Sequence, residues 1–417
     1  MPLLQRNLTD RVLEALSDTP VVLLHGARQT GKSTLVQQIA RSERPATYFT
    51  FDDATTMAAA ARDPLGFLDA QGGSVVLDEV QRVPDVLLAI KTLVDRERIP
   101  GRFLLTGSAN VLLLPKISES LAGRMEVLAL WPFSQGEIES RRDAFVDAVF
   151  APRMPATPSD EPANRRDLVQ RVLLGGYPEV LQRKARPRRS AWFEAYGTTV
   201  IHRELRDLAN LEYLTELPQL LRLLASRVGA QLNYAELAGT VGIPQTTLKR
   251  YLTLLRAVHL FVPLPAWSSS RAKRLVKRPK ILLADSGLIA HLIDLDEKQI
   301  EKDATAYGHL LECFVAMELR KQITWSRIRP SMYHFRTHSN AEVDLVLESP
   351  SGDIVGIEVK AASRVRSEDL RGLELLKDVA GDRFRRGVVL YTGTDSVSLG
   401  DNLHVTPMSA LWRTAPD

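Results

Sequence analysis

Residues 21–34 read VVLLHGARQTGKST, and this stretch decides the fold of the chain. It opens with an apolar run of strand length, residues 21–24, and then matches the pattern G-x-x-x-x-G-K-[ST] in full from Gly26 to Ser33. An apolar helical pattern follows from Leu35. A strand, a glycine-bracketed loop and a helix start are the context that a P-loop requires. The stretch therefore predicts a nucleotide-binding loop, and the plain alternative is a loop that merely joins a strand to a helix.

Each residue type in this loop suits a nucleoside triphosphate. Gly26 and Gly31 allow a tight backbone path on which N–H groups converge on phosphate oxygens, and the following helix start adds partial positive charge. We expect Lys32 to reach the β- and γ-phosphates and the Ser33 hydroxyl to bind Mg²⁺, so the predicted cofactors are ATP and Mg²⁺. The nucleotide-binding residues expected from the motif are Gly26, Ala27, Arg28, Gln29, Thr30, Gly31, Lys32, Ser33 and Thr34.

Composition places the chain among ordinary globular proteins. Its 417 residues are 45% hydrophobic and 25% charged, and this length predicts two or three domains. Because the formal net charge is only +4, a nucleic-acid-binding surface would have to come from local clusters of basic residues. Cys313 is the only cysteine, which excludes internal disulfides and cysteine-based metal sites. Without a signal-peptide pattern or a membrane-spanning apolar run, we expect a cytoplasmic protein with no membrane partner.

A second apolar strand pattern, residues 74–77, ends in Asp78 and Glu79. Downstream of a P-loop, this acidic pair is typical of a Walker B strand. Asp78 is expected to hold Mg²⁺, and Glu79 to polarise the water that attacks the γ-phosphate. The alternative is that the pair only ends a buried strand. The predicted reaction is hydrolysis of ATP to ADP and phosphate, with Lys32 and Glu79 among the catalytic residues.

Further strands and helices follow in alternation, which predicts a three-layer α/β domain with its ligand at the carboxyl ends of the strands. The strand at residues 102–106 is followed by Ser108, which we favour over Thr106 as the sensor of the γ-phosphate. Arg124 precedes a strand at residues 125–130 and is a candidate arginine finger. It is equally well explained as a surface arginine. A finger that acts on a neighbouring copy would require a homo-oligomer.

Residues 216–265 carry a helix-turn-helix pattern. Asn233 and Glu236 form a start like a capping box, and Gly242 lies at the turn. Strands at residues 261–265 and 280–283 would complete a winged helix, with a basic β-hairpin wing between them that suits phosphate contacts. The alternative is a protein-docking module. The expected DNA contacts are Gln245, Thr246, Lys249, Arg250, Arg271, Lys273, Arg274, Lys277 and Arg278.

The C-terminal part resembles a PD-(D/E)xK nuclease-type site in its spacing. Asp344 precedes Glu358-x-Lys360 on the next predicted strand, and the two-residue period of a strand puts Glu358 and Lys360 on one face. Glu312, on a predicted helix at residues 307–322, could join them. The carboxylates would hold Mg²⁺ or Mn²⁺, and Lys360 would activate a water for attack on a phosphodiester. The spacing leaves open a domain that keeps this fold without cleaving nucleic acid.

Several motifs occur in a fixed order along the chain. They are GARQTGKST, VVLDEVQ, FLLTGSAN, SLAGR, GGYPE, KRPKILLADSGL, GHLLE and AEVD with IEVK. In that order the chain resembles the prokaryotic AAA-type ATPases that carry the C-terminal domain of unknown function 4143, over residues 1 to about 365. The resemblance implies an ASCE-type P-loop core, a winged helix and a restriction-endonuclease-like fold. It also implies that Lys32 and Ser33 bind nucleotide and Mg²⁺ and that Asp78 and Glu79 support hydrolysis.

The predicted fold class is α/β, with a three-layer P-loop core, then a helical and winged-helix domain, then a restriction-endonuclease-like α/β domain. The expected domains are residues 1–140 (AAA-type ATPase), 141–215 (linker and helical region), 216–295 (winged helix) and 296–417 (nuclease-like). We expect an ATP-hydrolysing protein that binds and remodels DNA through its last two domains. The alternative is a nucleotide-switched protein-binding regulator whose nuclease-like domain is inactive.

Overall fold

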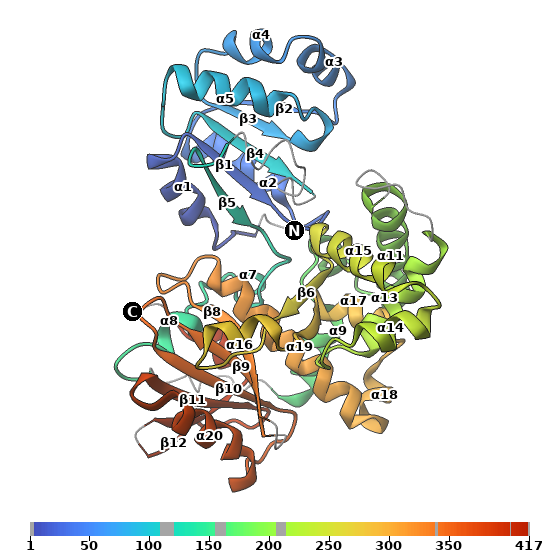
Figure 1. Cartoon of the computed structure of the whole chain (residues 1–417), viewed down its shortest axis with the longest axis vertical. Coiled ribbons are helices and arrows are strands. Elements are labelled where there is room, and N and C mark those ends of the chain that lie inside the picture. The colour runs from blue at the N-terminus through green and yellow to red at the C-terminus, as the bar shows by residue number, and fades with distance from the viewer. Residues whose placement is uncertain are drawn as a thin grey trace. The chain divides into compact units, whose positions relative to one another are not determined.

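The computed structural model describes residues 4–108, 121–154, 164–205, 214–337, 341–400 and 402–415. The chain divides into two compact units (Figure 1). One unit, which contains the P-loop, is made by Gln5–Pro132 together with Leu254–Leu260. The other contains Phe133–Thr253 and Phe261–Asp417. Each unit combines helices with a β-sheet, which confirms the predicted α/β class.

The unit with the P-loop is built on a five-stranded parallel sheet in the order β2-β3-β4-β1-β5. Its strands are β1 (Val21–His25), β2 (Thr47–Thr50), β3 (Val75–Asp78), β4 (Phe103–Gly107) and β5 (Met125–Ala129). Strand β4 lies between the P-loop strand β1 and the acidic strand β3, as expected of an ASCE-type core. Because all five strands are parallel, their carboxyl ends meet at one edge, where open α/β sheets bind ligands.

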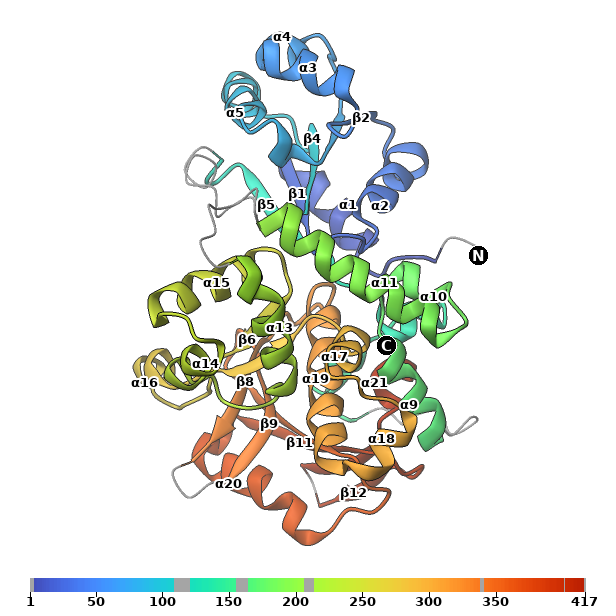
Figure 2. The same ribbon diagram turned by 90° about the vertical axis from the view of Figure 1, so that its right-hand side faces the viewer.

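Helices cover both faces of this sheet, which gives the predicted three layers (Figure 2). They are α1 (Thr9–Asp18), α2 (Lys32–Gln38), α3 (Ala54–Arg62), α4 (Pro64–Asp69) and α5 (Val86–Arg96). On one face, strand residues such as Leu77 and Leu105 share a buried core with Ile90 and Leu93 of α5. Helix α1 contacts β1, and α2 contacts β3 and β4. Burial of these apolar side chains fixes the loops at the carboxyl edge of the sheet.

The second unit begins with helices. They are α7 (Gln135–Ile138), α8 (Phe145–Ala148), α9 (Arg165–Leu174), α10 (Pro178–Leu181), α11 (Arg186–Thr199), α13 (Leu217–Ser226), α14 (Tyr234–Val241) and most of α15 (Gln245–Ala257), whose last residues, from Leu254, belong to the unit with the P-loop. Helices α14 and α15 are the pair predicted as a helix-turn-helix. The Asn233 side chain accepts a hydrogen bond from the Glu236 N–H at 3.4 Å, and Gly242 ends α14 with a φ of 79°. That left-handed backbone conformation favours glycine.

Strands β6 (Phe261–Leu264) and β7 (Lys280–Leu283) pair in antiparallel fashion, but the basic stretch between them is not the predicted β-hairpin. It contains a short helix, α16 (Arg271–Val276). The physical reason is composition, because the run Arg-Ala-Lys-Arg-Leu is made of strong helix formers and has no turn residue.

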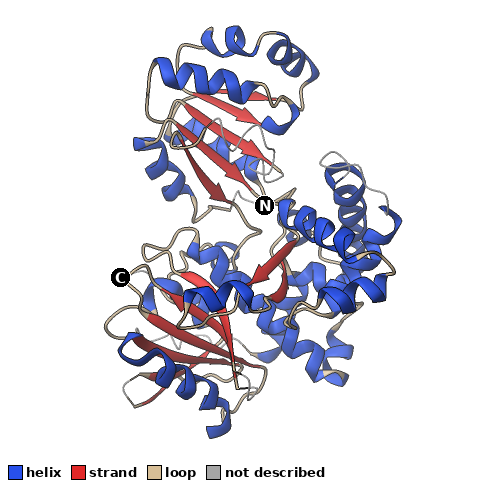
Figure 3. Ribbon diagram, in the orientation of Figure 1, coloured by secondary structure: helices blue, strands red, loops and turns tan. Residues whose placement is uncertain are grey.

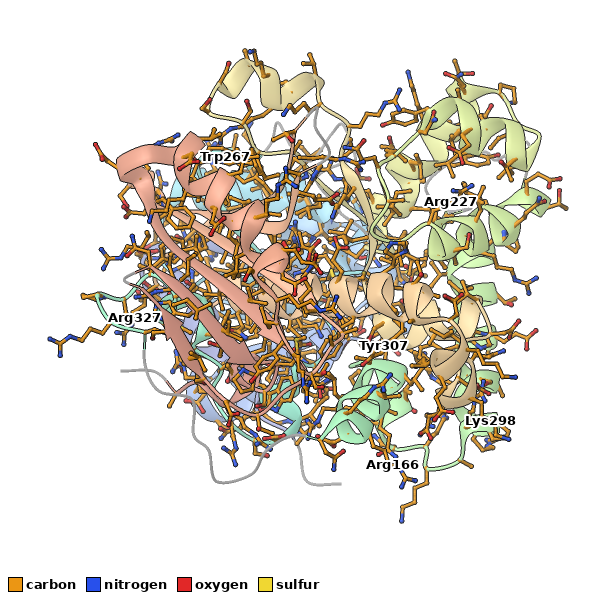
Figure 4. The ribbon with its side chains drawn as sticks, turned by 90° about the horizontal axis from the view of Figure 1, so that it is seen from below. Arg166, Arg227, Trp267, Lys298, Tyr307 and Arg327 are labelled. Carbon is orange, nitrogen blue, oxygen red and sulfur yellow. The ribbon has the colours of Figure 1, made fainter. Side chains whose placement is uncertain are left out.

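The chain ends in a mixed six-stranded sheet in the order β12-β13-β11-β10-β9-β8 (Figure 3). Its strands are β8 (Ser331–Arg336), β9 (Glu342–Glu348), β10 (Ile354–Lys360), β11 (Phe384–Tyr391), β12 (Val397–Leu399) and β13 (Leu403–Pro407). The helices of this region are α17 (Ser286–Leu292), α18 (Glu297–Lys302), α19 (Ala304–Ile323), α20 (Arg371–Ala380) and α21 (Ala410–Arg413). Leu373 and Leu376 of α20 pack into the sheet core, which also holds Trp267 (Figure 4).

Candidate functional site

The P-loop joins β1 to α2 at the carboxyl edge of the parallel sheet. Its two motif glycines meet steric demands. A Cβ atom on Gly26 would lie 2.1 Å from the Leu130 carbonyl oxygen, and Gly31 takes a φ of 94° in the left-handed region. The Thr30 hydroxyl donates to the Ala27 carbonyl at 2.9 Å and closes the loop on itself. The backbone path that the motif requires is therefore present.

Lys32, the motif lysine, is buried within this loop. Its Nζ donates to the carbonyl oxygens of Gly26 and Ala27, both at 2.9 Å. The ammonium group therefore lies inside the loop to which the motif assigns the phosphates. A positive charge at that position can neutralise phosphate oxygens without a rearrangement of the backbone.

Asp78, at the end of β3, connects the P-loop helix to two neighbouring strands. One carboxylate oxygen accepts from the Ser33 hydroxyl at 3.0 Å and from the Thr106 hydroxyl, and the other accepts from the Tyr48 hydroxyl at 2.8 Å. Burial raises the pKa of Tyr48 to about 12, so its phenol stays protonated and donates. The adjacent carboxylate and hydroxyl oxygens of Asp78 and Ser33 are the hard donors that Mg²⁺ prefers.

Glu79 follows Asp78 in an uncommon backbone conformation, with a φ of 62°. Its N–H donates to the Thr106 hydroxyl at 3.0 Å. The side-chain amide of Gln81 donates to the Glu79 carboxylate and, at 3.1 Å, to the Ser108 hydroxyl. Gln81 therefore links the predicted catalytic base to the predicted sensor.

Sequence reasoning missed the parts played by Tyr48 and Gln81. Tyr48 lies on β2, the neighbour of β3, so only the strand order brings it to Asp78. Gln81 had a visible signal, because it stands two residues after Glu79 in the motif VVLDEVQ. Its amide can reach back to the carboxylate since a tight turn, residues Val80–Arg82, follows the strand.

Arg124 is not brought to the P-loop of its own chain. It directly precedes β5, and its carbonyl accepts from the Val21 N–H at 3.3 Å, at the amino edge of the sheet. Its guanidinium pairs with Asp95 at 2.6 Å, and both side chains are partly exposed. The P-loop follows the opposite, carboxyl end of β1. Arg124 therefore lies at the edge of the sheet opposite the P-loop of its own chain.

A pair of histidines that sequence reasoning did not single out adjoins the P-loop. His25 ends β1, and its Nδ1 lies 2.9 Å from Nε2 of His259, in a segment that belongs to the same unit. Burial, aided by the Lys32 charge, lowers the pKa of His25 to about 4. Burial also lowers the pKa of His259 well below its usual value. Both rings are therefore neutral at pH 7, and one ring nitrogen donates to the other.

The four residues predicted for the nuclease-type site come close together in the second unit and form two ion-paired groups. Asp344 on β9 lies between the groups, and its Oδ2 accepts from the Val359 N–H at 2.9 Å. On one side, Lys360 Nζ lies 3.0 Å from Glu358 Oε1 and 3.3 Å from Asp369. Burial, with Asp344 as the next cause, raises the pKa of Glu358.

On the other side, Glu312 pairs with a lysine that sequence reasoning missed. Lys280 Nζ lies 2.6 Å from Glu312 Oε1 and 3.7 Å from Asp344 Oδ1, and it also pairs with Glu342. Burial alone would lower the pKa of Lys280, but the three carboxylates raise it above its usual value. Within the described residues, no group of three or more His, Cys, Asp and Glu side chains is arranged to hold a metal ion.

The predicted DNA contacts fall into three sets. Arg274 pairs with Glu348, and its guanidinium lies over the rings of Trp267 and Tyr333. Lys277 is half-buried and donates to the Arg336 carbonyl. Both side chains are therefore engaged in contacts within the second unit. The side chain of Arg271 lies outside the description. The exposed members are Gln245, Thr246, Lys249, Arg250, Lys273 and Arg278.

Family models match three successive parts of the chain. Residues 18–139 match an AAA domain, residues 165–299 match a domain of unknown function (DUF8612) and residues 307–411 match a domain of unknown function (DUF4143). The uncharacterized protein Rv2008c of Mycobacterium tuberculosis is 30% identical over 414 residues, which cover 98% of this chain and 85% of that protein. The uncharacterized protein Mb2031c of Mycobacterium bovis matches with the same values.

Two solved structures are partly similar to the chain. The RuvB Holliday junction branch migration motor of Thermotoga maritima is 17% identical with a TM-score of 0.29, over 62% of this chain and 89% of that one. A signal transduction ATPase with a tetratricopeptide repeat sensor, from Pyrococcus horikoshii, is 12% identical with a TM-score of 0.25, over 76% and 47%. Scores this low carry no argument about activity or partners. Separately, no helix among the described residues is long and apolar enough to cross a membrane.

Proposed function

This chain belongs to the family of P-loop AAA-domain proteins that carry a C-terminal DUF4143 domain, and on that premise we propose that it binds ATP with Mg²⁺ and hydrolyses ATP to ADP and phosphate. One observation carries the proposal. A chain of hydrogen bonds runs from Ser33 through Asp78 and Thr106 to the Glu79 N–H, so the residues proposed to hold Mg²⁺ and to activate water lie together at one edge of the sheet.

The residues take separate roles in this reaction. The P-loop N–H groups and Lys32 would hold the phosphates, while Ser33 and Asp78 would hold Mg²⁺, whose charge would offset that of the phosphate oxygens. Glu79 would orient and deprotonate the attacking water, because its backbone conformation and Gln81 hold the carboxylate in place. Ser108, fixed by the same amide, would contact the γ-phosphate.

Two substitutions separate binding from hydrolysis. Glu79→Gln keeps the shape of the site and removes the base, so we expect ATP binding close to that of the wild type and turnover reduced by at least about a hundredfold. Lys32→Ala is expected to lose ATP binding itself. Glu97→Gln, an exposed position in the same unit, is the matched control and should leave both unchanged. Full turnover in Glu79→Gln would contradict the assignment.

We further propose that the chain binds DNA through α15 and the basic segment at residues 271–278, and that ATP turnover remodels that DNA. Support comes from the exposed polar and basic side chains on these two elements, which are of the kind that contacts phosphates. Metal-dependent cleavage of DNA is not part of this proposed function.

Salt dependence tests the DNA contacts. Neutralisation of Lys249, Arg250, Lys273 and Arg278 to glutamine should weaken DNA binding strongly and flatten the salt dependence of the binding that remains, because each phosphate contact releases counterions. The matched control neutralises four exposed basic residues elsewhere in the same unit, Arg166, Lys298, Lys302 and Arg327. Arg166, Lys298 and Arg327 lie at the periphery of that unit (Figure 4). An equal loss in both variants, or binding insensitive to salt, would refute DNA contact by α15 and α16.

A second function is favoured by a specific observation on α16. Leu275 is 88% exposed and Val276 is 82% exposed, while the neighbouring Arg274 is used in packing. An apolar pair on a basic helix also suits a protein partner. In this reading the chain is a nucleotide-switched regulator with slow turnover and an inactive nuclease-like domain. Turnover that ignores every form of DNA, together with loss of a protein partner in Leu275→Ser, would favour it.

We also propose that the active form is a homo-oligomer in which Arg124 of one copy contacts the nucleotide of the next. Its place at the amino edge of the sheet supports this arrangement, because the residue is remote from its own P-loop. An arginine supplied by a neighbour stabilises the charge that develops on the transferred phosphoryl group.

A further inference from the structure

We propose that Lys280 is a built-in cation of the C-terminal carboxylate site and takes the place that a divalent metal ion would hold there. This role is independent of the proposed ATPase and DNA-binding functions. It concerns the site formed by Lys280 with Glu312, Glu342 and Asp344, which lies wholly within the second unit.

The Lys280 ammonium group is surrounded by three carboxylates. Its three carboxylate partners come from two different elements, Glu312 from α19 and the pair Glu342 and Asp344 from β9. Side-chain oxygens that converge from separate elements are the donors that Mg²⁺ and Mn²⁺ require. In this chain the charge at their centre belongs to the protein, and Lys280 is only 2% exposed.

The backbone holds Lys280 in place on both sides. The Leu232 N–H donates to the Pro279 carbonyl at 2.8 Å, and Ile281 exchanges hydrogen bonds with Gly229 and Ala230 at 2.8 and 2.9 Å. Lys280 itself forms an isolated bridge with Gln231. Since the residues before and after it are fixed, the side chain enters the site from a clamped strand and cannot leave by a local loop movement.

A second observation is a buried carboxylate oxygen next to this cluster that lacks a hydrogen-bond partner in the part of the chain that the structure describes. Glu358 lies beside Asp344, is 9% exposed, and its Oε2 has no hydrogen-bond partner among the described residues. A buried carboxylate oxygen without a partner is costly and is typical of a ligand position. As arranged around Lys280, Glu312, Glu342 and Asp344 do not form a metal site among the described residues. Removal of the Lys280 charge would leave them without their common counter-ion, and a divalent cation that draws the three carboxylates together could replace it.

The test measures binding of Mn²⁺ alone, without nucleotide, to the full chain. Electron paramagnetic resonance counts the Mn²⁺ ions bound per chain in the wild type, in Lys280→Met and in Lys280→Met combined with Asp344→Asn. We expect Lys280→Met to bind one more Mn²⁺ than the wild type and the double variant to lose it. We also expect Mn²⁺ to raise the thermal unfolding midpoint of Lys280→Met but not that of the wild type or the double variant.

Two results would overturn this role. One is a wild-type chain that already binds Mn²⁺ at this site, shown by loss of that ion in Asp344→Asn. The other is a folded Lys280→Met that gains no Mn²⁺ and no Mn²⁺-dependent stability. If Lys280→Met fails to fold, the wild type and Asp344→Asn still decide the matter, because equal Mn²⁺ binding by both supports the built-in cation. Lys280→Arg, which keeps a cation, should then fold and bind no additional Mn²⁺.

Discussion

At the scale of single residues, the P-loop site depends on partners that the motif does not name. The motif predicts the positions of Lys32 and Ser33, and the structure places Asp78 beside Ser33. The hydroxyls of Tyr48 and Thr106 and the amide of Gln81 complete the network. Their places follow from strand order and from a turn, which local spacing does not encode. The roles assigned to these side chains remain predictions.

Gln81 gives the first residue-scale prediction. Its amide donates to both Glu79 and Ser108, so loss of the amide should displace the Glu79 carboxylate without weakening ATP binding. We expect Gln81→Ala to lower the turnover number by about ten- to a hundredfold and to leave the dissociation constant for ATP unchanged. Steady-state kinetics and equilibrium nucleotide binding measure the two quantities. Gln71→Ala, in the same unit, is the control, and equal effects of the two substitutions would contradict a positioning role.

His25 gives the second prediction, on pH dependence. Its pKa is about 4 in the folded chain and 6.5 in the reference state, so on acidification the unfolded chain takes up the proton first. Stability from His25 is therefore present above pH 6.5 and is lost as the pH falls from 6.5 towards 4. Between about pH 7.5 and about pH 5.5, the free energy of unfolding should fall by about 1 kcal/mol on account of His25.

Urea unfolding at the two pH values measures this effect. His25→Asn should lack that part of the pH dependence, whereas His309→Asn, at an exposed position, should keep it. An unchanged pH dependence in His25→Asn would show that the histidine pair does not bury a neutral ring in the folded state.

At the scale of helices and strands, segments with a regular spacing of apolar residues could be predicted, and segments without such spacing could not. The strands at residues 74–77 and 102–106 were predicted within a residue or two, because apolar runs mark them. Helix α3 was missed, since its sequence ATTMAAAAR has almost no apolar stripe and depends on alanine propensity. The stretch at residues 271–280 was predicted as a hairpin from its flanking strands alone. Strands β11 and β13 follow the last recognised motif.

Asp285 carries the element-scale prediction, because it joins two motif segments. It caps α17 by accepting from the Leu288 N–H at 2.9 Å and also accepts from the Gly176 N–H at 2.7 Å. Asp285→Ala would leave both buried donors without a partner, so the free energy of unfolding should fall by about 2 kcal/mol. Asp378→Ala, at an exposed position on α20, is the control in the same urea titration. Equal midpoints for the two variants would contradict the capping role.

At the scale of the whole molecule, the sequence supported the α/β class and the family, and both are confirmed. The predicted domain boundaries remain a prediction. The C-terminal site shows why motif spacing has limits. The spacing from Asp344 to Lys360 predicts the carboxylates, but Lys280 enters from a different strand, and no spacing rule links it to Glu312. A pattern of ligands does not reveal which cation they surround.

Complementation between copies tests the proposed oligomer. Arg124→Ala should lower turnover by on the order of 10³, because a transition-state charge loses its partner. Glu79→Gln should be inactive for a different reason. If Arg124 acts on the neighbouring copy, a mixture of the two variants should recover part of the wild-type rate, since some interfaces combine an intact base with an intact arginine. A mixture as inactive as its components would contradict action in trans, provided that size-exclusion chromatography shows mixed oligomers.

The most direct measurement is the rate of ATP hydrolysis by the full chain with and without single-stranded, duplex and branched DNA, with Glu79→Gln as the blank. The account predicts Mg²⁺-dependent hydrolysis that at least one form of DNA accelerates, with no such signal in the variant. Neutralisation of Lys249, Arg250, Lys273 and Arg278 should remove the acceleration and leave the basal rate. A rate of hydrolysis that no form of DNA changes would contradict an ATPase that acts on DNA and would favour the protein-binding switch. A rate unaffected by Glu79→Gln would contradict the assignment of Glu79 as the catalytic base.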